Sequence, residues 1–145
     1  MDADSCPVKA EIVEIAQNFG VDVSFVASYN HMINNPLGGN WHYVDSDKEA
    51  ADLFIMNHVH AGDIAVTQDI GLASTLLAKN VYVLSPRGSL YDEKDIEAAL
   101  HMRYLAAKAR RQGKYGKGPK PFTTDDRISF EKNFTKLLSK IKGVL

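Results

Sequence analysis

The sequence has little cysteine, no long apolar run and almost no net charge. A single cysteine, Cys6, excludes an internal disulfide and is typical of a reducing, cytoplasmic setting. No uncharged apolar stretch approaches the roughly 20 residues that span a bilayer, and the first residues lack the basic-then-apolar pattern of a secretory leader. A formal net charge of −1 gives no global attraction to nucleic acid. We therefore expect a cytoplasmic protein with no membrane partner.

What the chain does contain is apolar runs that alternate with helical patterns. The segment 62–86 is the clearest case: the apolar run Ile64–Val66 leads through Thr67-Gln68-Asp69 into a helical pattern over residues 70–77, and a second apolar run follows at 81–84. This order predicts a strand–helix–strand unit of a parallel sheet. Open sheets of this kind bind ligands at the carboxyl ends of their strands, which is where Asp69 would stand.

Similar patterns predict elements on both sides of this unit. Before it, they predict a helix from Pro7 to Phe19 capped by Asp4 or Ser5 and closed by Gly20, strands at 21–27 and 41–44, and a helix to residue 59 capped by Ser46 or Asp47. After it, they predict a long helix from Asp92 to about 112 and a last helix capped by Thr124 or Asp125. We expect one domain, residues 1–145. Residues 1–90 would form an α/β core with an acidic site, and residues 91–145 would form helices with a basic loop at 113–124. The alternation favours a three-layer α/β fold around a mainly parallel central sheet, with the C-terminal helices on its flank.

Four carboxylates are candidates for a metal site: Asp2, Asp4, Asp52 and Asp69. In a parallel sheet, Asp2, Asp4 and Asp69 would share the carboxyl-terminal edge. Crowded carboxylates need protons or a cation at neutral pH, and Mg²⁺ or Mn²⁺ suits them as an oxygen-seeking ion. Such an ion would polarise a phosphoryl oxygen and activate water. The simpler interpretation is that Asp4 and Asp69 only cap helices.

Several longer motifs carry a resemblance to a known family. The sequences DADSCPVK, VDSDKEAADLFI, GDIAVTQDIGLA, SPRG and GPKPFTTDDR together resemble the bacterial YaiI/YqxD family over nearly the whole chain. That family is similar to the PIN-like domains, many of which are Mg²⁺- or Mn²⁺-dependent ribonucleases. The resemblance implies that Asp2, Asp52 and Asp69 match the acids of PIN domains, the last in a T-x-D arrangement that begins at Thr67. Asp4 is a neighbouring acid typical of the family.

Two departures from the PIN pattern are visible. The further acid that often follows the T-x-D aspartate is replaced by Gly71 and Leu72, and no strand precedes Asp2. Four or five buried apolar residues are worth roughly 10 kcal/mol, which is comparable to a whole domain's stability of about 5–15 kcal/mol. We therefore expect the natural chain to start a few codons before Met1.

The carboxyl-terminal part holds a basic set. Between Ala98 and Thr124 there is no acidic residue, and Tyr115 and Phe122 offer ring faces on which bases would stack. Lysines and arginines there would gain affinity for phosphates by releasing counterions, although a solvated helix end followed by a loop explains the pattern equally well. Arg87, just past a strand, is a further phosphate-ligand candidate that would equally suit an ion pair. The predicted substrate contacts are Thr67, Arg87, Arg103, Arg110, Arg111, Lys114 and Lys117.

Three functions remain open on this basis. The favoured one is a metal-dependent phosphodiesterase acting on RNA, with Asp2, Asp4, Asp52 and Asp69 holding Mg²⁺ or Mn²⁺. The second is a nucleic-acid-binding module without turnover, which uses the basic set alone. The third is a haloacid-dehalogenase-type phosphatase, because Asp2-Ala3-Asp4 resembles its D-x-D start with Asp2 as the nucleophile. The five histidines fit no tetrahedral zinc set.

Overall fold

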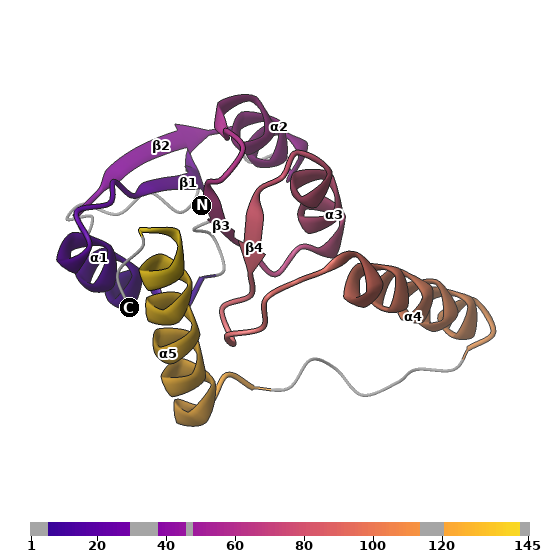
Figure 1. The fold of residues 1–145 in the computed structure, drawn as a ribbon. Coiled ribbons are helices and arrows are strands. Elements are labelled where there is room, and N and C mark those ends of the chain that lie inside the picture. The colour runs from indigo at the N-terminus through magenta and orange to yellow at the C-terminus, as the bar shows by residue number, and fades with distance from the viewer. Residues whose placement is uncertain (1–5, 30–37, 46–47, 114–120, 143–145) are drawn as a thin grey trace.

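The protein is an α/β structure. The computed structural model describes residues 6–29, 38–45, 48–113 and 121–142, and Figure 1 shows the arrangement of its helices and strands. In chain order these are α1 (Lys9–Asn18), β1 (Ser24–Ser28), β2 (Asn40–Val44), α2 (Lys48–His58), β3 (Ile64–Val66), α3 (Ile70–Ala78), β4 (Tyr82–Leu84), α4 (Glu93–Arg111) and α5 (Thr124–Ile141).

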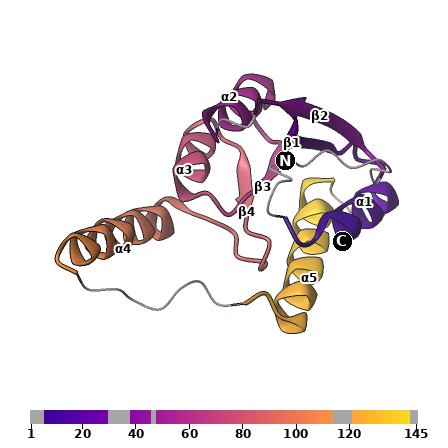
Figure 2. The same ribbon diagram turned by 180° about the vertical axis from the view of Figure 1, so that it is seen from behind.

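The strands form two separate parallel pairs. β1 pairs with β2 from Ser24 opposite Asn40 to Ser28 opposite Val44, and β3 pairs with β4 from Ile64 opposite Tyr82 onwards. Figures 1 and 2 show the four strands in the order β2, β1, β3, β4 across the molecule. The expected parallel pairing is present, but the described residues form two two-stranded sheets instead of one central sheet.

The strand–helix–strand unit predicted at 62–86 is confirmed as β3, α3 and β4. Its strands are parallel, and α3 buries Leu72, Ala73 and Leu76, of which the first two lie four and three residues before Leu76. A parallel pair needs a crossover connection, and a helix is the usual one. The local pattern was sufficient here because all three elements are contiguous in sequence.

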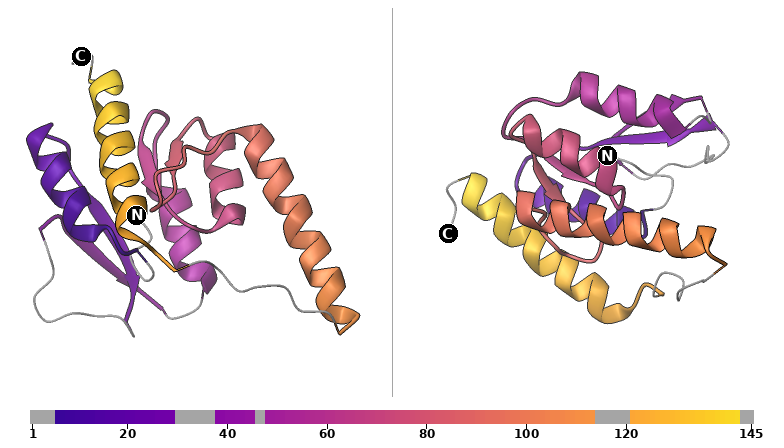
Figure 3. Two further views of the ribbon diagram at one scale, coloured as in Figure 1. Left: turned by 90° about the horizontal axis from the view of Figure 1, so that it is seen from below. Right: turned by 90° about the vertical axis from the view of Figure 1, so that its right-hand side faces the viewer.

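Helices cover both faces of the strands. One buried cluster joins Phe25 and Ala27 of β1 to residues of α1 and α5, while the intervening Val26 belongs to a second cluster with residues of α2, α3 and the start of α4. This alternation is the two-residue period of a strand, whose successive side chains point to opposite faces. Figure 3 shows α1 and α5 side by side, and α2 beside α3.

Several predicted boundaries need correction. The first helix starts at Lys9 with Val8 as its N-cap, two residues later than predicted, and the predicted caps Asp4 and Ser5 lie outside the described residues. The final helix is capped one residue earlier than expected, by Thr123, whose hydroxyl and the Asp126 carboxylate form a reciprocal capping box. The predicted caps Ser46 and Asp47 lie outside the described residues.

The long helix α4 projects from the body of the protein in Figures 1 and 2. Asp92, the predicted start of this helix, is its N-cap, and Ile96 near its start is buried. Its exposed apolar side chains are Leu100, Met102, Tyr104 and Leu105. No helix among the described residues is both long and apolar enough to cross a bilayer.

Candidate functional site

The turn between β3 and α3 fixes the position of Asp69. Its backbone N–H donates to Thr67 Oγ1 (3.0 Å), and Thr67 is itself buried at 2% exposure. The Thr67 N–H donates to Leu84 O at 3.1 Å, which anchors the turn to β4. The Thr-x-Asp spacing thus has a structural role, because the threonine side chain holds the aspartate backbone at the end of the strand.

The Asp69 carboxylate caps helix α3. Its Oδ1 accepts hydrogen bonds from the N–H groups of Gly71 (2.8 Å) and Leu72 (3.2 Å). The first N–H groups of a helix have no acceptor within the helix, and an N-cap side chain usually accepts hydrogen bonds from one or two of them. The simpler interpretation of Asp69 is therefore confirmed as far as Oδ1 is concerned. The cap also fixes the carboxylate in one orientation at the carboxyl end of β3.

Asp52 lies on the neighbouring helix. It is half-buried in α2 next to the buried Ala51, and α2 contacts α3. Asp69 is the N-cap of the helix that follows β3, whereas Asp52 lies near the middle of α2, the helix that follows β2. Asp2 and Asp4 lie outside the described residues. Of the four predicted metal ligands, the structure therefore describes only Asp52 and Asp69.

Side chains of the metal-ligating types are scattered in the described part of the chain. No group of three or more histidine, cysteine, aspartate or glutamate side chains suited to a metal occurs among them. Mg²⁺ prefers oxygen donors and is usually bound through one or two carboxylates and several waters, and the side chains of Asp52 and Asp69 are carboxylates of that type. Zinc has no matching set in this part of the chain, and His58 is instead engaged with its own helix through Nδ1 and Phe54 O at 2.7 Å.

Buried hydroxyl groups lie at the ends of three strands, and of these residues only Thr67 was singled out from the sequence. Ser28 ends β1, Thr67 follows β3 and Ser85 follows β4, and all three are almost fully buried. Ser85 Oγ accepts from the N–H groups of Arg87 (3.3 Å) and Ser89 (3.1 Å), which closes the turn after β4. Cys6 belongs to the same buried cluster as Ala27, Val66 and Leu84. The only sequence signal for Ser28 and Ser85 was a small polar residue directly after an apolar run.

Arg87 forms an ion pair with the start of α5. Its Nη1 lies 2.9 Å from Asp126 Oδ2 and also donates to Pro121 O at 3.4 Å. The pKa of Asp126 is lowered, first by the backbone hydrogen bond from Thr123 and then, against the opposing effect of desolvation, by the Thr123 hydroxyl and the Arg87 charge. The alternative foreseen for Arg87, pairing with an aspartate, is therefore present.

The predicted basic set is divided by the structure. Arg103, Arg110 and Arg111 are exposed on α4. Arg110 and Arg111 lie in its final turn, where their positive charges are attracted by the partial negative charge at the carboxyl end of the helix. Lys114 and Lys117 lie outside the described residues. Phe122, expected to stack on bases, instead packs against the core and has Arg127 over its ring at 5.3 Å.

Together these features define an α/β protein with parallel strand pairs, helices on both faces, one aspartate at the start of α3 and another within α2. Comparison with known proteins is consistent with one family. The model of the family described as "Uncharacterized BCR, YaiI/YqxD family" matches residues 1–140. The chain therefore belongs to the YaiI/YqxD family.

Its relatives are bacterial proteins of similar length. A UPF0178 protein of Listeria innocua, Lin1493, is 55% identical over 135 residues, covering 93% of this chain and 92% of the relative. A UPF0178 protein of Bacillus cytotoxicus, Bcer98_3021, is 50% identical over 145 residues, covering 100% and 95%. A UPF0178 protein of Bacillus pumilus is 49% identical over 147 residues, covering 100% and 88%. No solved structure gives a significant match to the chain.

Proposed function

We propose that this protein is a Mg²⁺- or Mn²⁺-dependent phosphodiester hydrolase that acts on RNA, built on a three-layer PIN-like fold. The observation that carries the proposal is the placement of Asp69, held at the carboxyl end of β3 by Thr67 and by the amides of Gly71 and Leu72. A carboxylate fixed in this way loses little conformational entropy when it binds a ligand. The position is also where open α/β sheets bind their ligands.

In this proposal Asp52 and Asp69, with Asp2 and Asp4, hold the metal directly or through water. When bound, the ion would polarise a phosphoryl oxygen and lower the pKa of water. Two amide donors hold Asp69 Oδ1 in one orientation. This chain's own residues would thus present a fixed carboxylate without needing a side-chain nucleophile.

An Asp69→Asn variant separates chemistry from capping. Asparagine caps helices about as well as aspartate, so the variant should keep its thermal midpoint while it loses the carboxylate. We expect Mn²⁺-dependent cleavage of labelled single-stranded RNA by the parent protein, abolished by chelator and reduced at least about 100-fold in the variant.

The matched control is Asp92→Asn at the N-cap of α4. Asp92 accepts from the Asp95 N–H at 2.7 Å, so the same chemical change is made at the same kind of position on another helix. This control should cleave like the parent. The hydrolase proposal fails if no condition gives cleavage, or if the Asp69→Asn variant cleaves as fast as the control.

The projecting helix α4 supports a second candidate function, an RNA-binding module without turnover. Its exposed Arg103, Arg110 and Arg111 stand on a helix that leaves the body of the protein. Replacing all three by glutamine should weaken RNA binding and reduce its salt dependence, because fewer counterions are released. Binding that depends on these arginines, in the absence of any cleavage, would favour this second function.

A further inference from the structure

One face of helix α4 is a stripe of exposed side chains that changes character along the helix. Residues three or four apart lie above one another on a helix surface. The stripe is acidic in the first half of α4, apolar in the middle and basic in the last half. Its apolar members are 38% and 58% exposed. The six residues of this α4 stripe, all exposed, are Glu93, Glu97, Leu100, Tyr104, Lys108 and Arg111.

The fold presents the α4 stripe to the solvent. Ile96, near the start of α4, belongs to the buried cluster that contains Leu72 and Leu76 of α3, which fixes this end of the helix to the body of the protein. Every residue of α4 after Ile96 is exposed or half-buried. Figures 1 and 3 show the helix extending away from the other elements. A partner can therefore approach the stripe along most of its length.

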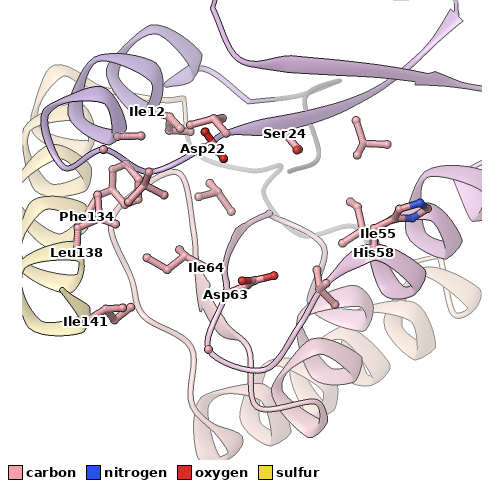
Figure 4. A pocket seen from close by; sticks show the side chains of 18 of the residues that line it. Ile12, Asp22, Ser24, Ile55, His58, Asp63, Ile64, Phe134, Leu138 and Ile141 are labelled. Carbon is pink, nitrogen blue, oxygen red and sulfur yellow. The ribbon is translucent and has the colours of Figure 1, made fainter.

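The stripe is also separate from the hollow between the strand pairs. That hollow has a volume of about 650 Å³, and the described residues that line it come from α1, α2, α5, the strands β1 to β3 and the adjoining turns, as Figure 4 shows in part. None of these lining residues belongs to α4. A substitution on the stripe therefore changes neither the hollow nor the buried core, so the stripe can be tested in a folded protein.

The helix dipole explains only part of this arrangement. The dipole favours acids at the start and bases at the end of a helix, wherever they lie around its circumference. On the stripe, however, like charges are neighbours: Glu93 lies four residues before Glu97, and Lys108 lies three residues before Arg111. Like charges at such a spacing slightly destabilise an isolated helix. A partner with opposite charges would remove that cost and would cover the apolar middle of the stripe.

The stripe is complementary to a second copy of itself that runs in the opposite direction. When Leu100 is level with Tyr104 of the second copy, Glu93 is level with Arg111 of that copy, because each charge lies seven residues outward from the apolar residue on its own helix. The remaining acid and base of the stripe are one residue out of level, a step of about 1.5 Å. The acidic half of each helix thus meets the basic half of the other, and the apolar side chains meet at the centre.

We propose that α4 is a dimerisation helix, which pairs antiparallel with α4 of a second copy of this chain through the α4 stripe. The twofold axis crosses the pair midway between Leu100 and Tyr104. A twofold dimer uses the same patch on both copies, so the patch must be complementary to itself. Because the two ends of the stripe have opposite charges, it meets that requirement only when the helices are antiparallel. This pairing is independent of the hydrolase function.

The first test compares two leucines of α4. Leu100→Gln places an amide on the stripe, whereas Leu105→Gln makes the same change at a leucine that is 43% exposed and lies off the stripe. Glutamine forms helices about as well as leucine, so both variants should keep the parent's circular dichroism. Sedimentation equilibrium from about 1 µM to about 1 mM should show a dimer for the parent and for Leu105→Gln. The dissociation constant of Leu100→Gln should be at least about 10-fold higher.

The second test exchanges charges across the twofold axis. Glu93→Arg alone and Arg111→Glu alone each place like charges opposite one another at both ends of the pair, so each should raise the dissociation constant by about 10-fold at low salt. An equimolar mixture of the two variants should restore the parent's affinity, because each end then joins an acid to a base. In a parallel pair each residue would face its own copy, and neither single variant would add a repulsion that the parent lacks.

Three outcomes would overturn the proposal. A parent protein that stays monomeric over the whole concentration range would show that α4 does not pair with itself. Equal dissociation constants for the two leucine variants would place the interface on another surface. A mixture of the two charge variants that associates no more strongly than either variant alone would exclude the antiparallel arrangement. None of these measurements depends on RNA cleavage, so their failure is distinct from a failure of the hydrolase function.

Discussion

Gly88 is the position where a single added methyl group should be most damaging. It lies in the turn between β4 and α4 with a φ of 95°, and a Cβ built there would stand 2.8 Å from both the carbonyl carbon and the oxygen of Ser129. Because these are backbone atoms of α5, no side-chain rotation relieves the contact. The Asn133 side chain also donates to Gly88 O at 2.7 Å, so the turn is held against the helix.

Two costs add for Gly88→Ala. Placing a residue with a Cβ at positive φ costs about 1–3 kcal/mol, and overpacking a tight contact costs about 1–3 kcal/mol more. The expected loss of roughly 2–6 kcal/mol is a large share of a total stability of about 5–15 kcal/mol. At about 2–4 °C per kcal/mol, the thermal midpoint should fall by roughly 5–20 °C. Urea unfolding followed by circular dichroism measures the free energy directly.

Gly62→Ala is the matched control. Its φ is 89°, close to that of Gly88, but no atom of the described residues lies within 4 Å of the place that the added methyl group would take. The control should therefore show the conformational cost alone, about 1–3 kcal/mol. Equal losses of stability in the two variants would refute the reasoning, since the contact with Ser129 would then contribute nothing.

Two further predictions concern α5. Because the pKa of Asp126 is lowered in the folded protein, its contribution to stability is present above the unfolded-state pKa of about 3.9 and is lost as the pH falls through the lower folded value. The stability difference between the parent and Asp126→Asn should therefore shrink when urea unfolding is moved from pH 7 to below pH 4, and a constant difference would contradict this. Phe130 is fully buried, so Phe130→Ala should cost about 3–5 kcal/mol, whereas Ile128→Ala, 57% exposed on the same helix, should stay within about 0.5 kcal/mol. Similar losses for the two would show that Phe130 is not part of the core.

The predicted acidic site illustrates how far sequence reasoning reached. The Thr67-Gln68-Asp69 motif predicted a carboxylate at a strand end, and it lies there as the N-cap of α3. Whether Asp69 and Asp52 act together depends on how α2 and α3 pack, which no local pattern contains. The pairing of Arg87 with Asp126 joins residues 39 positions apart, and the sequence allowed it only as one of two alternatives for Arg87.

By itself the sequence determined the local structure of this protein. Helix periodicity, the cap at Asp92 and the left-handed Gly20 depend on hydrogen bonds and side-chain contacts within about four residues, so the chain encodes them directly. Only the tertiary structure decided how the strands meet. Within the described residues, β1 and β3 belong to separate two-stranded sheets, because lateral pairing depends on contacts between segments far apart in the sequence, and these are a property of the assembled fold.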